Sequence, residues 1–158
     1  HSTSRRQRQM CIRDSSNNGA NLSQGQRQLI SIARAAVAAF ASQLDPTLGE
    51  IGDIKTAVSE AVTNAVVHAY PEKLGMVMLR VRILPDERLE IVVKDHGVGI
   101  PDVEKAKTPL YTTGGEERSG MGFTIMESFM DSLAVRSKNG KGTVVTMKRR
   151  IALRTARR

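Results

Sequence analysis

Aromatic side chains, cysteines and long apolar runs are scarce in this 158-residue chain. It has no Trp, two Tyr, three Phe and a single cysteine, Cys11. One cysteine cannot form an internal disulfide or a cysteine-based metal cluster, which excludes a disulfide-stapled secreted scaffold. No apolar run reaches the roughly 20 residues of a membrane span, and no signal-peptide pattern is evident. We therefore expect a cytoplasmic protein without membrane contact, whose core is aliphatic and rich in methionine.

Positive charge is concentrated at the two ends of the chain, whose formal net charge is +8. Residues 1–34 carry +5 and residues 148–158 carry +6, which leaves −3 for residues 35–147. A nucleic-acid-binding face needs cations clustered on a folded surface, and few aromatic side chains are available to stack on bases. Direct nucleic-acid binding is therefore not expected, and a basic nucleic-acid binder that acts through its tails is the minor alternative.

The first half of the chain predicts a leader followed by two helices. Residues 1–21 are rich in Arg, Gln, Ser and Asn and show no apolar periodicity, which predicts a disordered or foreign leader. Apolar residues then recur at helical spacing over residues 26–43, and again between Pro46 and Pro71. At the other end of the chain, residues 149–158 are expected to form a basic tail.

The second half predicts two strand pairs, a glycine-rich loop and one more helix. Alternation with a period of two indicates strands, whereas six glycines and two prolines within 28 residues indicate a loop. The elements expected here are strands 76–84 and 88–95, a loop over 95–122, a helix over 121–129, and strands 132–137 and 143–148. This order favours the α/β class, as a two-layer sandwich with helices on one face of a mixed, mostly antiparallel sheet.

Two polar residues interrupt the apolar second helix. Glu60 and Asn64 are four residues apart and therefore share one helix face. A carboxylate placed there can act as a general base, and an amide oxygen can ligate a hard cation such as Mg²⁺. The alternative is that one or both side chains are solvated on the exposed face of the helix.

Glycines accompany polar residues at three other element ends. Asp95 ends a strand and is followed by Gly97 and Gly99, which let the backbone turn close to a ligand. Residues 118–122 lead through two glycines into a helix, whose free amides can bind phosphate. Thr143 follows a glycine at the start of the last strand, where its hydroxyl could reach a ligand. Each motif alone is also typical of an ordinary turn, helix start or strand.

Together the four motifs resemble the nucleotide-binding boxes of the gyrase, Hsp90, histidine-kinase and MutL ATPase superfamily, which has the Bergerat ATP-binding fold. DPTLGEIGDIKTAVSEAVTNAVVHAY, TPLYTT and ERSGMGFTIMESFMD more closely resemble the anti-sigma F family of endospore-forming bacteria, over about residues 33–148. That family implies a dimeric cytoplasmic protein that inhibits a sporulation sigma factor and phosphorylates a serine of its anti-anti-sigma antagonist with ATP. Arg34 and Arg118 would contact these partners. A non-catalytic module that sequesters sigma in an ATP-dependent way is the alternative.

The resemblance also implies roles for individual residues. Glu60 would be the catalytic base, Asn64 would ligate Mg²⁺, and Asp95 would accept a hydrogen bond from the adenine amine. Residues 107–119 would form a lid over the phosphates. The residues expected to bind ATP or ADP are Asn64, Asp95, Gly97, Gly99, Thr112, Thr113, Gly120, Met121, Gly122 and Thr143.

Three features depart from the family pattern. The family's first β-strand is expected to be absent, because residues 1–21 show no strand pattern. Instead, NLSQGQRQLISIARAAVA at residues 21–38 resembles the signature segment of ABC-transporter ATPases, which predicts a chimera joined near residues 33–38. Convergence of an arginine-bearing helix is the alternative. No Walker A phosphate loop occurs in the chain, which excludes an ABC ATPase as the whole function. The expected lid has Gly114-Gly115 where the family has Lys-Pro.

Overall fold

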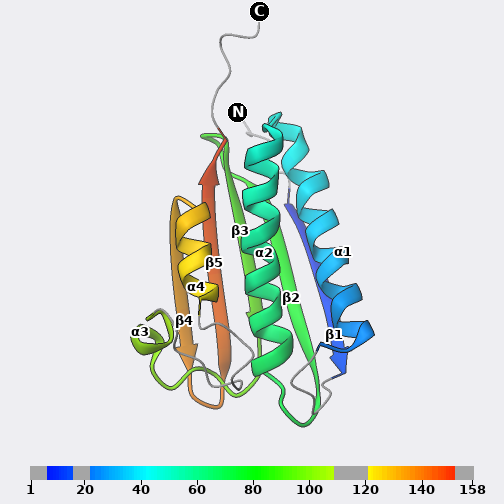
Figure 1. The fold of residues 1–158 in the computed structure, drawn as a ribbon, viewed down its shortest axis with the longest axis vertical. Coiled ribbons are helices and arrows are strands. Elements are labelled where there is room, and N and C mark those ends of the chain that lie inside the picture. Colours follow the sequence, from blue (N-terminus) through cyan, green and yellow to red (C-terminus); the bar gives the residue numbers. More distant parts are fainter. Residues whose placement is uncertain (1–6, 16–21, 109–120, 152–158) are drawn as a thin grey trace, which may run out of the picture.

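A computed structural model describes residues 7–15, 22–108 and 121–151, and it places helices on one face of a five-stranded sheet (Figure 1). The strands are β1 (Gln7–Ser15), β2 (Leu74–Ile83), β3 (Arg88–Asp95), β4 (Ser132–Lys138) and β5 (Gly142–Arg150). The helices are α1 (Gln24–Ala41), α2 (Leu48–His68), α3 (Val103–Ala106) and α4 (Gly122–Phe129), with a 3-10 turn, η1 (Ser42–Leu44). The predicted two-layer α/β sandwich is confirmed.

The strand order is β1-β2-β3-β5-β4, and each neighbouring pair of described strands is antiparallel. The mostly antiparallel character predicted for the sheet is confirmed, and no parallel pair occurs among the strands that the structure describes, so this part of the sheet is not mixed. The two predicted strand pairs are confirmed as β2–β3 and β4–β5, and the predicted final helix is confirmed as α4. The predicted loop over 95–122 contains one short helix, α3, within its described part.

The prediction that residues 1–21 are disordered, and that the first strand is absent, is wrong for residues 7–15. These residues form β1, which pairs with β2 from Gln7 opposite Arg82 to Ser15 opposite Leu74. The polar composition of this segment hid its strand potential, because strand formation depends on the neighbouring edge more than on intrinsic propensity. Here that edge is the outer side of β2, whose backbone groups would otherwise be unpaired.

The prediction of a basic tail over residues 149–158 is wrong for residues 149–151. Arg149 and Arg150 belong to β5, and Ile151 is fully buried in the core. Arg88 of β3 lies opposite Arg150, so the strand ladder continues to this point. The prediction of a tail was based on net charge. The backbone pairing of Arg149 and Arg150 and the burial of Ile151 show that the segment starts inside the fold.

Both long helices start with a reciprocal capping box. In α1 the Ser23 hydroxyl accepts from the Gln26 amide (3.1 Å) and the Gln26 side chain accepts from the Ser23 amide (2.9 Å). In α2 Thr47 and Glu50 make the same pair of bonds, at 3.0 and 2.8 Å. Such boxes satisfy amides that have no partner within the helix. The α1 box lies at the start of the ABC-like segment, residues 21–38, whose origin in a join remains a prediction.

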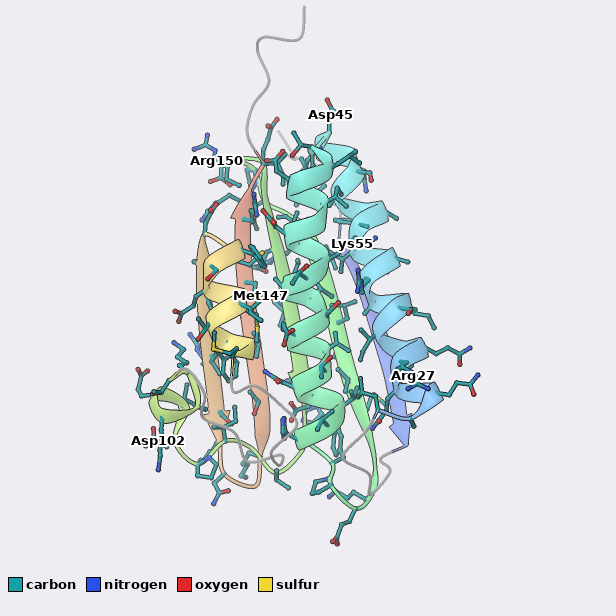
Figure 2. All side chains as sticks on the ribbon, in the orientation of Figure 1. Arg27, Asp45, Lys55, Asp102, Met147 and Arg150 are labelled. Carbon is teal, nitrogen blue, oxygen red and sulfur yellow. The ribbon has the colours of Figure 1, made fainter. Side chains whose placement is uncertain are left out.

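The core lies between the helices and the inner face of the sheet. Met147 of β5 is fully buried and lies between α2 and α4 in the view of Figure 2. The core is aliphatic with methionine, as the composition predicts, and its largest fully buried side chains are Ile54, Leu79, Leu89, Ile91, Met126, Met147 and Ile151. Within the part of the chain that the structure describes, no helix is long and apolar enough to cross a membrane.

Arg149 connects three elements. One guanidinium nitrogen, Nη1, donates to the Asp53 carboxylate of α2 (2.9 Å) and to the Phe129 carbonyl at the end of α4 (2.7 Å). The Arg149 side chain is only 18% exposed, so water screens these bonds weakly. Arg149 therefore fixes α2 and α4 relative to β5.

We expect Arg149→Met to lower the free energy of unfolding by about 1–2 kcal/mol, because it leaves the Phe129 carbonyl without its charged donor. Urea unfolding followed by circular dichroism measures this change. Arg136→Met is the matched control, because Arg136 is exposed on β4. Equal stability of the two variants would contradict a connecting role for Arg149.

Candidate functional site

The two polar residues of α2 face the start of α4. A Cβ built on Gly122, the first residue of α4, would lie 3.3 Å from Glu60 Oε2 and 3.2 Å from Asn64 Nδ2. The other Asn64 amide atom, Oδ1, would lie 3.4 Å away. The side chains of Glu60 and Asn64 are half-buried, so they are neither enclosed in the core nor fully exposed to solvent. The structure thus brings together three predicted site residues, although Gly122 is 62 positions from Glu60 and 58 from Asn64 in the chain.

The start of α4 can hold an anion. Met121 precedes the helix and contributes no side-chain capping bond, so no side chain of that residue competes for the first amides. Unpaired amides and the helix dipole at such a start attract phosphate oxygens. Because Gly122 lacks a side chain, an anion can approach the backbone beside Glu60 and Asn64.

Asp95 is the second centre of the site. It ends β3 on the helix-covered face and is 6% exposed. Its Oδ1 accepts from the amides of Gly97 (3.0 Å) and Thr143 (3.2 Å), and these two bonds fix the orientation of the carboxylate. Burial raises the pKa of Asp95, and the two amide bonds oppose that rise.

The loop after Asp95 requires glycine because backbone packs directly on backbone. A Cβ on Gly97 would overlap the Ala69 carbonyl just beyond α2, and a Cβ on Gly142 would overlap the Asp95 carbonyl. Gly99 and Gly142 also have positive φ angles, of 78° and 107°. The predicted glycines therefore bring Asp95, the end of α2 and the start of β5 within contact of one another.

Ser137 is a site residue that the sequence reasoning missed. Its hydroxyl lies 2.8 Å from the Thr143 hydroxyl, accepts from the Ile100 amide (2.6 Å) and donates to the Gly142 carbonyl (3.1 Å). Ser137 lies opposite Thr143 in the β4–β5 ladder, so counting outward from the Asn139-Gly140 turn could have found it. As a lone serine in a strand it carries no motif.

The remaining predicted residues fall into two groups. Arg34 is exposed on α1, which packs against α2, β1 and β2. It therefore lies away from α4 and from the loop after Asp95, and it is not part of this site. Thr112, Thr113, Arg118 and Gly120 lie outside the described residues, as does most of the lid expected over 107–119.

Comparison with known proteins defines the class to which this fold and site belong. Residues 6–149 match the family described as the histidine kinase-like ATPase domain. The fold is similar to the histidine kinase domain of a blue-light activated kinase from Erythrobacter litoralis, with a TM-score of 0.54, 23% identity, and coverage of 77% of this chain and 61% of that one. It is also similar to the mycobacterial sensor histidine kinase MprB, with a TM-score of 0.52, 22% identity, and coverage of 65% and 74%. The chain is thus a histidine kinase-like ATPase domain, a class that binds ATP or ADP.

Curated relatives narrow the class further. The chain is 61% identical to the anti-sigma F factor of Caldanaerobacter subterraneus over 118 residues, which cover 74% of this chain and 82% of the relative. It is 56% identical to that of Clostridium acetobutylicum over 124 residues, which cover 78% and 86%. The anti-sigma F factor of Pasteuria penetrans is 60% identical over 119 residues, with coverage of 74% and 79%. The chain therefore belongs to the anti-sigma F factor family, as its motifs predict.

We expect Asp95→Asn to weaken ATP binding by roughly tenfold or more while leaving the fold intact. The amide oxygen can still accept from Gly97 and Thr143, but the amide nitrogen would face the adenine amine as a second donor. Stability should stay constant or rise, because burial disfavours the charged carboxylate that is removed. Isothermal titration calorimetry and thermal unfolding measure the two effects.

The same substitution tests the protonation of Asp95. Because the pKa of Asp95 is raised, wild-type ATP affinity should begin to fall on acidification at a higher pH than an ordinary aspartate would cause. Asp95→Asn should remove that part of the pH dependence. An unchanged pH profile in the variant would show that Asp95 is not the titrating group.

Gly122→Ala should weaken ATP binding by about tenfold without lowering stability. The added methyl group crowds Glu60 and Asn64 and obstructs the start of α4, whereas alanine itself favours a helix. Gly52→Ala on α2 is the matched control, since a Cβ there meets nothing within 4 Å. Equal ATP affinity of both variants would place the phosphates elsewhere.

Proposed function

We propose that this protein inhibits a sporulation sigma factor and phosphorylates a serine of an anti-anti-sigma factor with ATP. The observation that carries the proposal is the contact of Glu60 and Asn64 with the glycine start of α4. It puts a carboxylate, an amide oxygen and helix amides around one point. The anti-sigma name of its relatives supports the choice of partner.

In this proposal ATP lies between the two centres of the site. Asp95 Oδ2 accepts from the adenine amine, and Thr143 and Ser137 lie beside that contact. The triphosphate extends toward α4, whose first amides bind its oxygens. The charge of the ligand is thus met by backbone dipoles, in keeping with the acidic balance of residues 35–147.

Mg²⁺ fits this arrangement through Asn64. No cluster of three or more His, Cys, Asp or Glu residues suited to a metal occurs in the described ranges. Mg²⁺ at nucleotide sites is commonly held by one or two protein oxygens together with phosphate oxygens. Asn64 Oδ1, beside the start of α4, is such an oxygen. The ion would neutralise the charge of the phosphates.

Glu60 is proposed as the base for transfer. It accepts the proton of the partner's serine hydroxyl as the serine oxygen bonds to the γ-phosphorus. The bond from that phosphorus to the β,γ-bridging oxygen breaks, and ADP leaves. Phosphoryl transfer depends mainly on positioning and charge neutralisation, so a single carboxylate next to the phosphate site is sufficient.

Partner contacts complete the proposal. Arg34 is exposed on α1, away from the nucleotide site, and is therefore available to a protein partner. Arg118 would add a second contact from the lid. We further propose that the protein acts as a cytoplasmic homodimer, by analogy with the family that its motifs resemble. A non-catalytic protein that only sequesters sigma would make the same contacts, but it would not need Glu60 as a base.

We expect Glu60→Gln to reduce phosphate transfer by about 100-fold or more, because the neutral amide cannot accept the serine proton. ATP affinity should change by no more than about twofold, since the shape of the side chain is kept. Transfer from γ-labelled ATP with Mg²⁺ to a recombinant anti-anti-sigma factor measures the first quantity, and calorimetry measures the second.

Glu127→Gln, exposed on α4, is the matched control and should retain full transfer. Retained transfer in Glu60→Gln would remove Glu60 from the role of base. A wild-type protein that binds ATP and sigma but transfers no phosphate would rule out the kinase and leave the sequestering module.

A further inference from the structure

Tyr70 is a buried polar residue to which neither the motifs nor the transfer chemistry assigns a role. It lies just beyond α2 and is 3% exposed. Its hydroxyl donates to the Met76 carbonyl (2.7 Å) and accepts from the His96 amide (2.7 Å). A buried tyrosine hydroxyl needs one partner, and this one has two that belong to different strand ends.

The hydroxyl lies where the β2–β3 ladder stops. The last pair of that ladder is Val77 opposite Asp95, so one further step would place Met76 opposite His96. The Tyr70 hydroxyl occupies the position between the Met76 carbonyl and the His96 amide. The hydroxyl thus takes the place of a direct hydrogen bond between Met76 and His96. The β2 and β3 segments separate at this point, immediately after Asp95.

The ring of Tyr70 is held as firmly as its hydroxyl. A Cβ built on Gly75 would overlap three ring carbons, so the ring lies flat against the β2 backbone at Gly75. The preceding residue, Ala69, accepts a hydrogen bond from the Val98 amide (2.9 Å). Adjacent residues at the end of α2 therefore fix both His96 and Val98, on either side of the glycine that orients Asp95.

We propose that Tyr70 is a positioning residue that sets the direction of the Asp95 carboxylate and so determines selectivity for the base of the nucleotide. This inference rests on the proposed binding of ATP at Asp95. Without the hydroxyl, the Met76 carbonyl and the His96 amide either lose their partner or bond directly to each other. Either outcome moves His96, and with it the amide of Gly97 that orients Asp95 Oδ1. Within the described ranges, no hydrogen bond joins Tyr70 to Gly122 at the phosphate end.

The test is Tyr70→Phe, which removes only the hydroxyl. Dissociation constants for ATP, GTP and inorganic tripolyphosphate are measured by calorimetry at a temperature well below unfolding. ATP affinity should fall by about tenfold, the size expected for misplacing one hydrogen bond to a charged group. The preference for ATP over GTP should shrink, and tripolyphosphate affinity should not change.

Phe40→Leu provides a stability-matched control. Phe40 is a buried aromatic residue in the last turn of α1, five positions before Asp45. Figure 2 shows Asp45 at the opposite end of the molecule from Arg27 and Asp102. Phe40→Leu should lower the unfolding temperature without altering the ratio of ATP to GTP affinity. A Tyr70→Phe protein whose ATP, GTP and tripolyphosphate affinities all fall equally, or all stay at wild-type values, would overturn the proposal.

Gly75→Ala tests the same inference without removing a polar atom. Its methyl group must displace the Tyr70 ring and should reproduce the loss of base selectivity, and it serves if Tyr70→Phe does not fold. Unchanged selectivity in a folded Gly75→Ala protein would also overturn the proposal. A wild-type protein that binds tripolyphosphate but shows no preference for ATP would instead contradict the proposed role of Asp95.

Discussion

The whole site depends on the placement of α2. Glu60 and Asn64 lie on the helix itself, against the start of α4, and the residues just beyond it hold the loop that follows Asp95. One rigid helix therefore fixes both ends of the proposed nucleotide site. Its position is in turn fixed by its buried apolar face and by the bond from Arg149 to Asp53. A shift of α2 would move both ends of the site together, so the two ends keep their relative positions.

Burial of Asp95 is the main electrostatic cost of this arrangement. A carboxylate out of water favours its neutral form, and the raised pKa of Asp95 reflects that. Two backbone amides offset part of the cost and orient the group, without introducing a cation that would compete with the ligand amine. In the proposed binding mode, this carboxylate favours a ligand that places a hydrogen-bond donor at this position.

The sequence predicted most elements and the nucleotide motifs because both depend on local pattern. Helical periodicity marked α2, alternation marked β2 and β3, and glycines next to Asp95 and before α4 marked the close approaches. It did not predict β1, because residues 7–15 pair with β2 through backbone groups that any sequence supplies. It did not find Ser137 or Tyr70 either, since their roles arise from which carbonyls and amides the fold places beside each hydroxyl.

These omissions share a physical cause. A motif records residues that must touch a ligand, whereas Ser137 and Tyr70 touch only the protein and act on the ligand through Thr143 and Asp95. Hydroxyls are suited to that role because one group can donate and accept at once, and so can join two backbone groups that are not bonded to each other. In this fold the strand ends beside Asp95 are joined in that way twice, by Tyr70 on the β2 side and by Ser137 on the β4 side. In the proposed site, the geometry that discriminates between ligands is therefore set by Tyr70 and Ser137, which support the residues that a family motif identifies.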